Sequence, residues 1–351
     1  MQHTTFGRTS GLRVSELALG AGTFGSRRFP GTDPDEARAI FDLFAEAGGT
    51  FIDVAESYQA GEAEEILGGL LGGRRTEFTV ATKFSFGVGA PTVMHTGNSR
   101  KNMRRAVDDS LKRLRTDYID LLWVHLADNV TPTEEILRGL DDLARQGKIL
   151  HAGLSNFPAW RTARAVAIAE LRGLIPVVGA QFEYSLVERT AEREILPMAE
   201  ALGLGGALWS PLGGGLLTGK YRTSREGRLT DWNGFVLQKE DTDQKTAVVD
   251  TLLTVADELS ARPGQVAIAW LRERVARAAT PLVIVTGPRT LPHMEDYLGA
   301  LEVQLDAEQY ARLDGVSRVP LGEPHGVLSE SRPRVLGGDA DRFRAPVVPV
   351  S

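Results

Sequence analysis

Four ionisable side chains lie at the ends of successive apolar, strand-like runs, or just beyond them. Asp53 follows residues 50–52, and Tyr58 comes five positions later. Lys83 closes the run 78–82, and His125 closes the run 118–124. A tyrosine, a lysine, an aspartate and a histidine brought together can transfer a proton to a reacting oxygen without a metal ion.

These residues can meet only if parallel strands end at one common edge, as they do in a barrel whose active site forms at the C-terminal ends of the strands. Strand-like runs cover residues 15–20, 50–54, 78–83, 118–125, 149–155, 176–182, 206–210 and 282–286. Helical patterns cover 35–47, 62–71, 100–115, 133–146, 158–169, 193–201 and 246–277. This alternation predicts an α/β fold, a (β/α)8 TIM barrel, with a doubly wound open sheet as the alternative.

No linker divides the chain, so residues 1–351 are predicted to form a single barrel domain. An N-terminal hairpin is expected around Thr9-Ser10-Gly11. Residues 213–243 are Gly-rich and then polar, which predicts a long functional loop after the seventh strand. Residues 319–351 are rich in Pro, Gly and Arg and are predicted to be a loop-like C-terminal tail.

Composition narrows the class of protein. The net charge is −6 without a basic block, which argues against nucleic acid as a partner. The absence of cysteine excludes disulfides and thiolate metal sites and favours the cytoplasm. The six histidines lack metal-binding spacing, so no metal site is expected. No signal peptide or membrane span of roughly 18–20 apolar residues is evident.

Residues 20–25 match the Gly-x-Gly-x-x-Gly pattern of dinucleotide-binding sites. That site needs a helix that begins at its third glycine, whereas the helix signal here begins only near Asp33. We therefore expect Gly22, Thr23 and Phe24 to lie beside a ligand at the mouth of the first strand.

Residues 214–220 resemble a phosphate-binding P-loop, but Tyr221 follows the lysine where a Mg²⁺-binding hydroxyl residue is needed. A nucleoside triphosphatase is therefore disfavoured. The glycines and Lys220 can still hold a phosphate through backbone N–H groups and charge.

Several linked motifs occur in order between residues 6 and 316. They are Phe51-Ile52-Asp53-Val54-Ala55-Glu56-Ser57-Tyr58, Ala81-Thr82-Lys83, Gly153-Leu154-Ser155-Asn156, Gln181 with Tyr184-Ser185-Leu186, Trp209-Ser210-Pro211-Leu212 and Gly287-Pro288-Arg289-Thr290. With them the chain resembles the aldo-keto reductase family, in particular the branch of bacterial reductases and potassium-channel β subunits. The resemblance implies a (β/α)8 barrel that binds NADPH and reduces an aldehyde or ketone to an alcohol.

The resemblance implies a role for each of the four ionisable residues. Tyr58 is the general acid, and because a free phenol has a pKa near 10, it needs a nearby cation to give up its proton readily. Lys83 supplies that cation and Asp53 keeps it charged. His125 donates a hydrogen bond to the substrate oxygen. Taken singly, each residue also has a structural interpretation, such as a capped turn or a core histidine.

The resemblance also implies a cofactor site. Ser155, Asn156 and Gln181 hold the nicotinamide carboxamide, and Trp209 stacks on the ring. Arg289, after the eighth strand, suits a 2′-phosphate and favours NADPH over NADH. The other expected cofactor-binding residues are Leu212, Gly215, Leu217, Gly219, Lys220 and Arg228 at the pyrophosphate, Gly287 after the eighth strand, Asp296 and Tyr297 near the adenine, and Ser210 and His293. Tyr297 is expected to stack on the adenine ring.

Two other functions remain open at this point. One is a cofactor-sensing regulatory protein like the channel β subunits, which is less expected because those proteins usually carry an N-terminal extension and this sequence starts almost at the barrel. The other is a barrel enzyme of another class, such as an isomerase. The substrate is expected to be a small carbonyl compound, and its identity (sugar, small aldehyde, aromatic or polyketide ketone), the preferred reaction direction and the oligomeric state stay undetermined.

Overall fold

Eight parallel strands close into a barrel in the computed structural model, which describes residues 1–89, 92–223, 237–344 and 346–350. Around the barrel the order is β10-β3-β4-β5-β6-β7-β8-β9. The strands are β3 (Leu17–Gly20), β4 (Phe51–Asp53), β5 (Thr79–Phe84), β6 (Ile119–Val124), β7 (Ile149–Ser155), β8 (Val177–Glu183), β9 (Gly205–Trp209) and β10 (Leu282–Thr286). The predicted (β/α)8 barrel is confirmed, and the open-sheet alternative is wrong.

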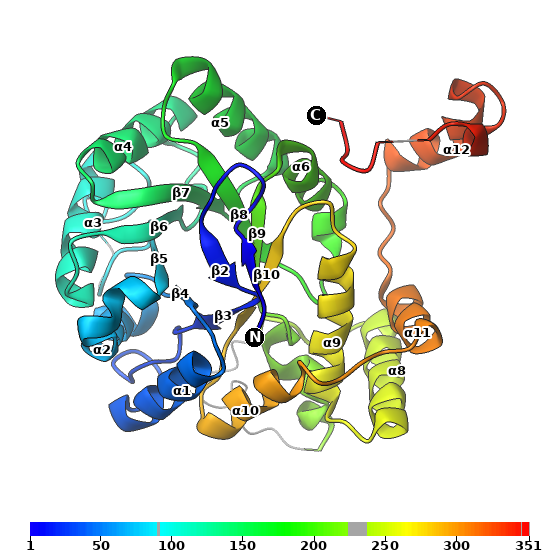
Figure 1. The fold of residues 1–351 in the computed structure, drawn as a ribbon, viewed down its shortest axis with the longest axis horizontal. Coiled ribbons are helices and arrows are strands. Elements are labelled where there is room, and N and C mark those ends of the chain that lie inside the picture. Colours follow the sequence, from blue (N-terminus) through cyan, green and yellow to red (C-terminus); the bar gives the residue numbers. More distant parts are fainter. Residues whose placement is uncertain (90–91, 224–236, 345, 351) are drawn as a thin grey trace.

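Helices surround the barrel and bury their apolar faces against it (Figure 1). They are α1 (Pro34–Glu46), α2 (Glu62–Leu71), α3 (Arg100–Leu114), α4 (Thr133–Arg145), α5 (Ala159–Arg172), α6 (Ile195–Leu202), α8 (Asp243–Leu259), α9 (Pro263–Ala276), α10 (Leu291–Gly299) and α11 (Ala307–Ser317). The longer helical region predicted over 246–277 consists of two helices, α8 and α9. Ser260 has a φ of 51° and Pro263 begins α9, so the chain turns between two helices.

The expected N-terminal hairpin is confirmed. It consists of β1 (His3–Thr5) and β2 (Arg13–Ser15), paired antiparallel. The first barrel strand therefore begins at Leu17, whereas the sequence pattern began it two residues earlier, inside β2. Phe6, which lies between the hairpin strands, is fully buried. Its ring makes edge contacts with the rings of Phe51 and Trp123, with ring centroids 5.6 and 5.9 Å apart. These rings fill the barrel interior with a packed apolar layer.

The C-terminal tail differs from the loop expected over 319–351. It contains the helix α12 (His325–Val335), which stands outside the ring of barrel helices in Figure 1, and the short 3-10 turn η6 (Ala340–Arg342). Among the described residues, no helix has the length and apolar character needed to cross a bilayer.

Candidate active site

The four ionisable residues of the sequence pattern meet at the C-terminal end of the barrel. Asp53 ends β4, Lys83 lies near the end of β5, and His125 directly follows β6. Tyr58 begins the short 3-10 turn η1 (Tyr58–Gly61) that leads into α2. The parallel register places the ends of these strands side by side, which is why residues up to 72 positions apart in the chain share one site.

Lys83 is the centre of the group. Its ammonium donates hydrogen bonds to Asp53 Oδ2 at 2.5 Å, to the Val54 carbonyl at 3.0 Å and to the Tyr58 hydroxyl at 3.1 Å. The side chain is fully buried, which alone disfavours its charged form, but Asp53 and Tyr58 outweigh this effect and raise the pKa of Lys83. A buried ammonium whose charged form is favoured by Asp53 therefore donates to the phenol oxygen.

Tyr58 is half-buried, and its position is set by two neighbouring loops. Gly22 in the β3–α1 loop lies beside the Tyr58 ring, where a Cβ atom would be 3.5 Å from the ring, an ordinary van der Waals contact. The next residue, Gln59, has a φ of 49°, and its buried side chain accepts hydrogen bonds from the backbone N–H groups of Arg28 and Phe29. Gln59 thus ties the turn that carries Tyr58 to the loop after β3.

His125 completes the group as a neutral imidazole. Its ring meets the Tyr58 ring edge-on, with centroids 5.9 Å apart. Burial and the nearby Lys83 ammonium hold the pKa of His125 well below its ordinary value. A neutral imidazole can donate one hydrogen bond without bringing a second cation to the site.

We expect His125 to stay neutral at pH 6.5, about the ordinary pKa of histidine. Below that pH the unfolded chain binds a proton here and the folded chain does not. The stability that neutral His125 contributes is therefore complete above about pH 6.5 and is lost as the pH falls. An NMR titration of labelled histidines would measure this, with His125→Gln identifying the resonance. Protonation near pH 6.5 would contradict the expectation.

The residues expected at the nicotinamide lie beside this group and are linked to it. Gln181 donates a hydrogen bond to Asp53 Oδ1 at 3.0 Å. Asn156 donates to the His125 carbonyl and to Ser155 Oγ, both at 3.0 Å, and its own oxygen accepts from the Trp209 indole at 3.2 Å. The Trp209 ring is half-buried at the end of β9. The Asn156 N–H also donates to the Gln181 carbonyl at 3.0 Å, so polar contacts join the expected ring-binding residues to Asp53 and to the His125 backbone.

The long loop after β9 begins with two tight turns, η4 (Gly213–Thr218) and η5 (Lys220–Arg222). Ser210 Oγ accepts a hydrogen bond from the Gly214 N–H, which folds the chain back on itself. Leu217 is fully buried, so its side chain packs in the core. Leu212, Gly215, Gly219 and Lys220 are each half-buried along this segment. Arg228 lies outside the described residues.

The loops after β3 and β10 are joined beside the barrel mouth. Thr23 Oγ1 donates to the Pro288 carbonyl at 2.8 Å, and Thr32 Oγ1 donates to the Arg289 carbonyl at 2.9 Å. Phe24 is fully buried, so its side chain packs in the core and does not face a ligand. Gly287 and Arg289 are half-buried next to this junction.

Of the residues expected near adenine, Asp296 is paired and Tyr297 is largely buried. Asp296 pairs with Arg262, the residue directly before α9, and Tyr297 is only 8% exposed and packs with the hydrophobic core. His293 is exposed, and its Nδ1 accepts the Arg289 N–H at 3.4 Å. Stacking of adenine on Tyr297 thus has little ring surface available.

Sequence reasoning missed a buried polar group next to the site. Glu56 is fully buried and accepts hydrogen bonds from the backbone of Ser85 and Gly87, just after β5. A charged residue three positions after Asp53, inside an apolar stretch, was the available signal.

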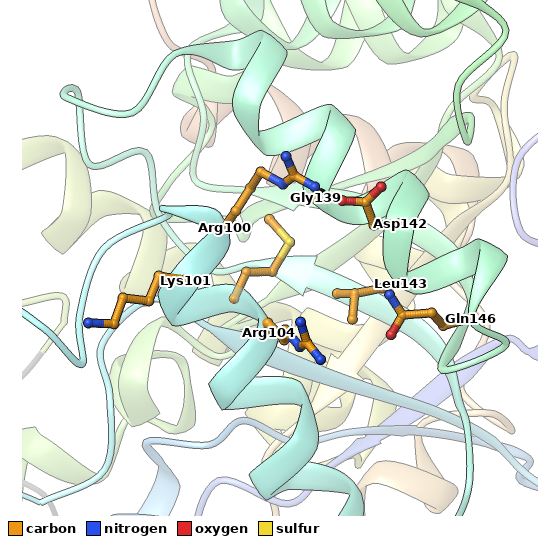
Figure 2. A pocket seen from close by; sticks show the side chains of 8 residues that line it. Arg100, Lys101, Arg104, Gly139, Asp142, Leu143 and Gln146 are labelled. Atoms are coloured by element: carbon orange, nitrogen blue, oxygen red, sulfur yellow. Dashed lines mark hydrogen bonds and ion pairs between the residues drawn. The ribbon is translucent and has the colours of Figure 1, made fainter.

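A groove on the outer face between α3 and α4 is separate from this site (Figure 2). Its lining residues are Arg100, Lys101, Met103, Arg104, Gly139, Asp142, Leu143 and Gln146, and Arg100 pairs there with Asp142. None of the predicted site residues is among them. In the parts of the chain that the structure describes, no three His, Cys, Asp or Glu side chains group as metal ligands would.

A known family matches most of the chain. The family model described as "Aldo/keto reductase family" covers residues 16–318. The chain belongs to the aldo/keto reductase family. The resemblance drawn from the sequence motifs is confirmed, and the (β/α)8 barrel agrees with it.

Relatives of this aldo/keto reductase are oxidoreductases. The chain is 37% identical to the "Uncharacterized oxidoreductase YrpG" of Bacillus subtilis, over 92% of this chain and 98% of that protein. It is 34% identical to the "Aryl-alcohol dehydrogenase [NADP(+)]" of Phanerodontia chrysosporium, over 92% and 88%. It is also 34% identical to "Norsolorinic acid reductase A" of Aspergillus parasiticus, over 94% and 84%. The chain is thus an oxidoreductase of this family.

Proposed function

We propose that this aldo/keto reductase uses NADPH to reduce an aldehyde or ketone to an alcohol, with Tyr58 as the general acid. The observation that carries the proposal is the contact of the buried Lys83 ammonium with both Asp53 and the Tyr58 hydroxyl. The cysteine-free composition makes the cytoplasm the expected compartment.

Each side chain of the group has one task. NADPH, when bound, supplies the hydride that reaches the carbonyl carbon. The carbonyl oxygen then becomes negative, and Tyr58 gives its hydroxyl proton to that oxygen. The Lys83 ammonium stabilises the phenolate left behind, and Asp53 keeps Lys83 charged and oriented. His125, neutral, donates a hydrogen bond to the same substrate oxygen and aligns it.

The residues around the barrel mouth suit a nicotinamide cofactor. The half-buried Trp209 ring offers a flat surface beside the polar groups of Ser155 and Asn156. The loop after β9 carries compact Gly-rich turns and Lys220, and the loop after β10 carries Arg289. Short polar groups for an amide, an aromatic face for a ring and cations for phosphates are what such a cofactor requires.

A titration of tryptophan fluorescence with NADPH and NADH tests the proposal. We expect quenching, tighter binding of NADPH than of NADH, and oxidation of NADPH when a carbonyl compound is added. The names of two relatives, an aryl-alcohol dehydrogenase and a norsolorinic acid reductase, make aromatic aldehydes and ketones the first substrates to screen. Binding of NADPH without turnover of any carbonyl would favour a cofactor-sensing role. Failure to bind either nucleotide would overturn the proposal.

Arg289→Ala is the matched variant in this titration. Loss of a guanidinium from a 2′-phosphate removes a charge-assisted contact, so we expect NADPH binding to weaken by about 10-fold or more. NADH lacks that phosphate and should bind almost unchanged. Equal weakening of both nucleotides would show that Arg289 does not recognise the 2′-phosphate.

A further inference from the structure

We propose that Phe86 is a positioning residue for the His125 imidazole, and that the buried Glu56 carboxylate holds Phe86 in place. The proposal rests on the proposed function, because it assumes that His125 aligns the substrate oxygen. It concerns the turn Ser85-Phe86-Gly87, which directly follows β5 and places Phe86 three residues after Lys83.

The His125 ring needs a source of orientation other than hydrogen bonding. Its Nδ1 atom is buried, and no group among the described residues forms a hydrogen bond with it. Contacts with neighbouring aromatic rings can orient the imidazole instead. The Phe86 ring lies 4.8 Å from the imidazole at an interplanar angle of 80°, and the Tyr58 ring lies 5.9 Å away at 84°. The imidazole therefore has an edge-on aromatic neighbour in Phe86 that is closer than Tyr58.

The turn that carries Phe86 has an unfavourable backbone conformation. Ser85 has a φ of 147° and Gly87 a φ of 75°, on either side of Phe86. A Cβ atom at Gly87 would lie 2.5 Å from the His95 carbonyl oxygen, so only glycine fits there. Such a conformation persists when the surrounding structure imposes it.

Glu56 imposes it. Its Oε1 atom accepts hydrogen bonds from the backbone N–H groups of both Ser85, at 3.1 Å, and Gly87, at 3.0 Å. One carboxylate oxygen thus binds the residues on both sides of Phe86. Burial raises the pKa of Glu56 despite these bonds and the guanidinium of Arg105, whose nearest nitrogen lies 3.6 Å from Oε2. A buried carboxylate is costly, and this one acts directly on the turn.

A second connection links the same turn to the residue after His125. Ser85 Oγ donates to Asn98 Oδ1 at 2.6 Å, and Asn98 Nδ2 donates to the Leu126 carbonyl at 2.7 Å. Asn98 is fully buried. The backbone of His125 also donates to the Phe84 carbonyl at 3.0 Å. The turn and His125 therefore belong to one hydrogen-bonded unit, and a shift of one would move the other.

Filling of the core does not explain Phe86. Its side chain is 46% exposed, unlike the buried phenylalanines of the barrel, so its apolar surface contributes little to stability. Its aromatic ring contact is with His125. Replacement of Phe86 is expected to change the site with little effect on the fold.

The test compares Phe86→Leu with the matched control Phe86→Tyr, which keeps the aromatic ring. NMR spectra of labelled histidine report the His125 ring, assigned with His125→Gln. In Phe86→Leu we expect a shift of the His125 ring resonances, a loss of about 10-fold or more in kcat, and little change in NADPH affinity or thermal midpoint. In Phe86→Tyr we expect the resonances and kcat to stay near those of the parent protein.

Glu56 is tested in the same way. Glu56→Gln keeps an oxygen that can accept both backbone N–H groups, whereas Glu56→Leu does not. We expect Glu56→Leu to reproduce the His125 shift and the kcat loss of Phe86→Leu. We expect Glu56→Gln to keep the His125 resonances and kcat close to those of the parent protein.

Two outcomes would overturn the proposal. One is an unchanged His125 resonance and kcat in Phe86→Leu. The other is a raised substrate KM with unchanged kcat, which would make Phe86 a substrate contact only. The resonance measurement needs no substrate, so it still tests the positioning if the protein proves not to reduce carbonyls.

Discussion

Tyr58→Phe is expected to lower kcat for carbonyl reduction by about 100-fold to 10,000-fold, the range that loss of a general acid produces. The variant removes one oxygen and keeps the ring, so the packing against Gly22 and the Lys83 ammonium, 4.6 Å from the ring centroid, should persist. NADPH affinity should therefore change little. Steady-state kinetics and the fluorescence titration, performed on the same preparation, measure the two quantities.

A matched variant distinguishes the effect of losing the Tyr58 hydroxyl from the effect of disturbing the turn that carries Tyr58. Gln59→Ala removes the hydrogen bonds to Arg28 and Phe29 but leaves the Tyr58 hydroxyl. Its loss of kcat should be smaller than that of Tyr58→Phe. If Tyr58→Phe kept more than a tenth of the parent turnover, another group would have to be the proton donor.

Lys83→Met should lower both activity and stability. Methionine fills a similar volume but leaves the Asp53 carboxylate, 3% exposed, without its cation. Breaking a buried ion pair in this way typically costs about 3–5 kcal/mol in the free energy of unfolding. Turnover should fall because nothing then stabilises a phenolate at Tyr58. Urea denaturation and steady-state kinetics measure the two effects.

The double variant Lys83→Met with Asp53→Asn distinguishes charge from packing. Asparagine removes the uncompensated charge, and its oxygen can still accept the hydrogen bond from Gln181. We expect most of the lost stability to return while activity stays low. Recovery of turnover in the double variant would argue against an essential Lys83, and a double variant as unstable as Lys83→Met would indicate that packing dominates.

The barrel strands were predictable because their signal is local. The predicted bounds of β7 and β10 coincide with the observed ones, since both are short, largely apolar runs between residues that interrupt the apolar pattern. The helix α12 was missed because it contains Pro333 and lies among glycines, which normally end helices. The prediction gave residues 246–277 as one longer helical region and did not place the break between α8 and α9 within it.

The prediction of the catalytic residues depended on the residue pattern and on the expected direction of the strands. Residue type and order along the chain singled out Asp53, Tyr58, Lys83 and His125, and strand direction predicted that they would meet. The role of Glu56 could not be read in that way, because its partners are backbone N–H groups of a turn that belongs to another strand. Backbone groups carry no sequence signal.

The sequence by itself determined the family, the succession of strands and helices, and the residue types at the strand ends, because these depend on patterns among near neighbours. Only the tertiary structure decided which atoms touch. Gln181 reaches Asp53 across 128 positions of the chain, and Lys83 uses its ammonium on three oxygens at once. Such contacts exist because the barrel closes, and closure depends on the packing of all eight strands together.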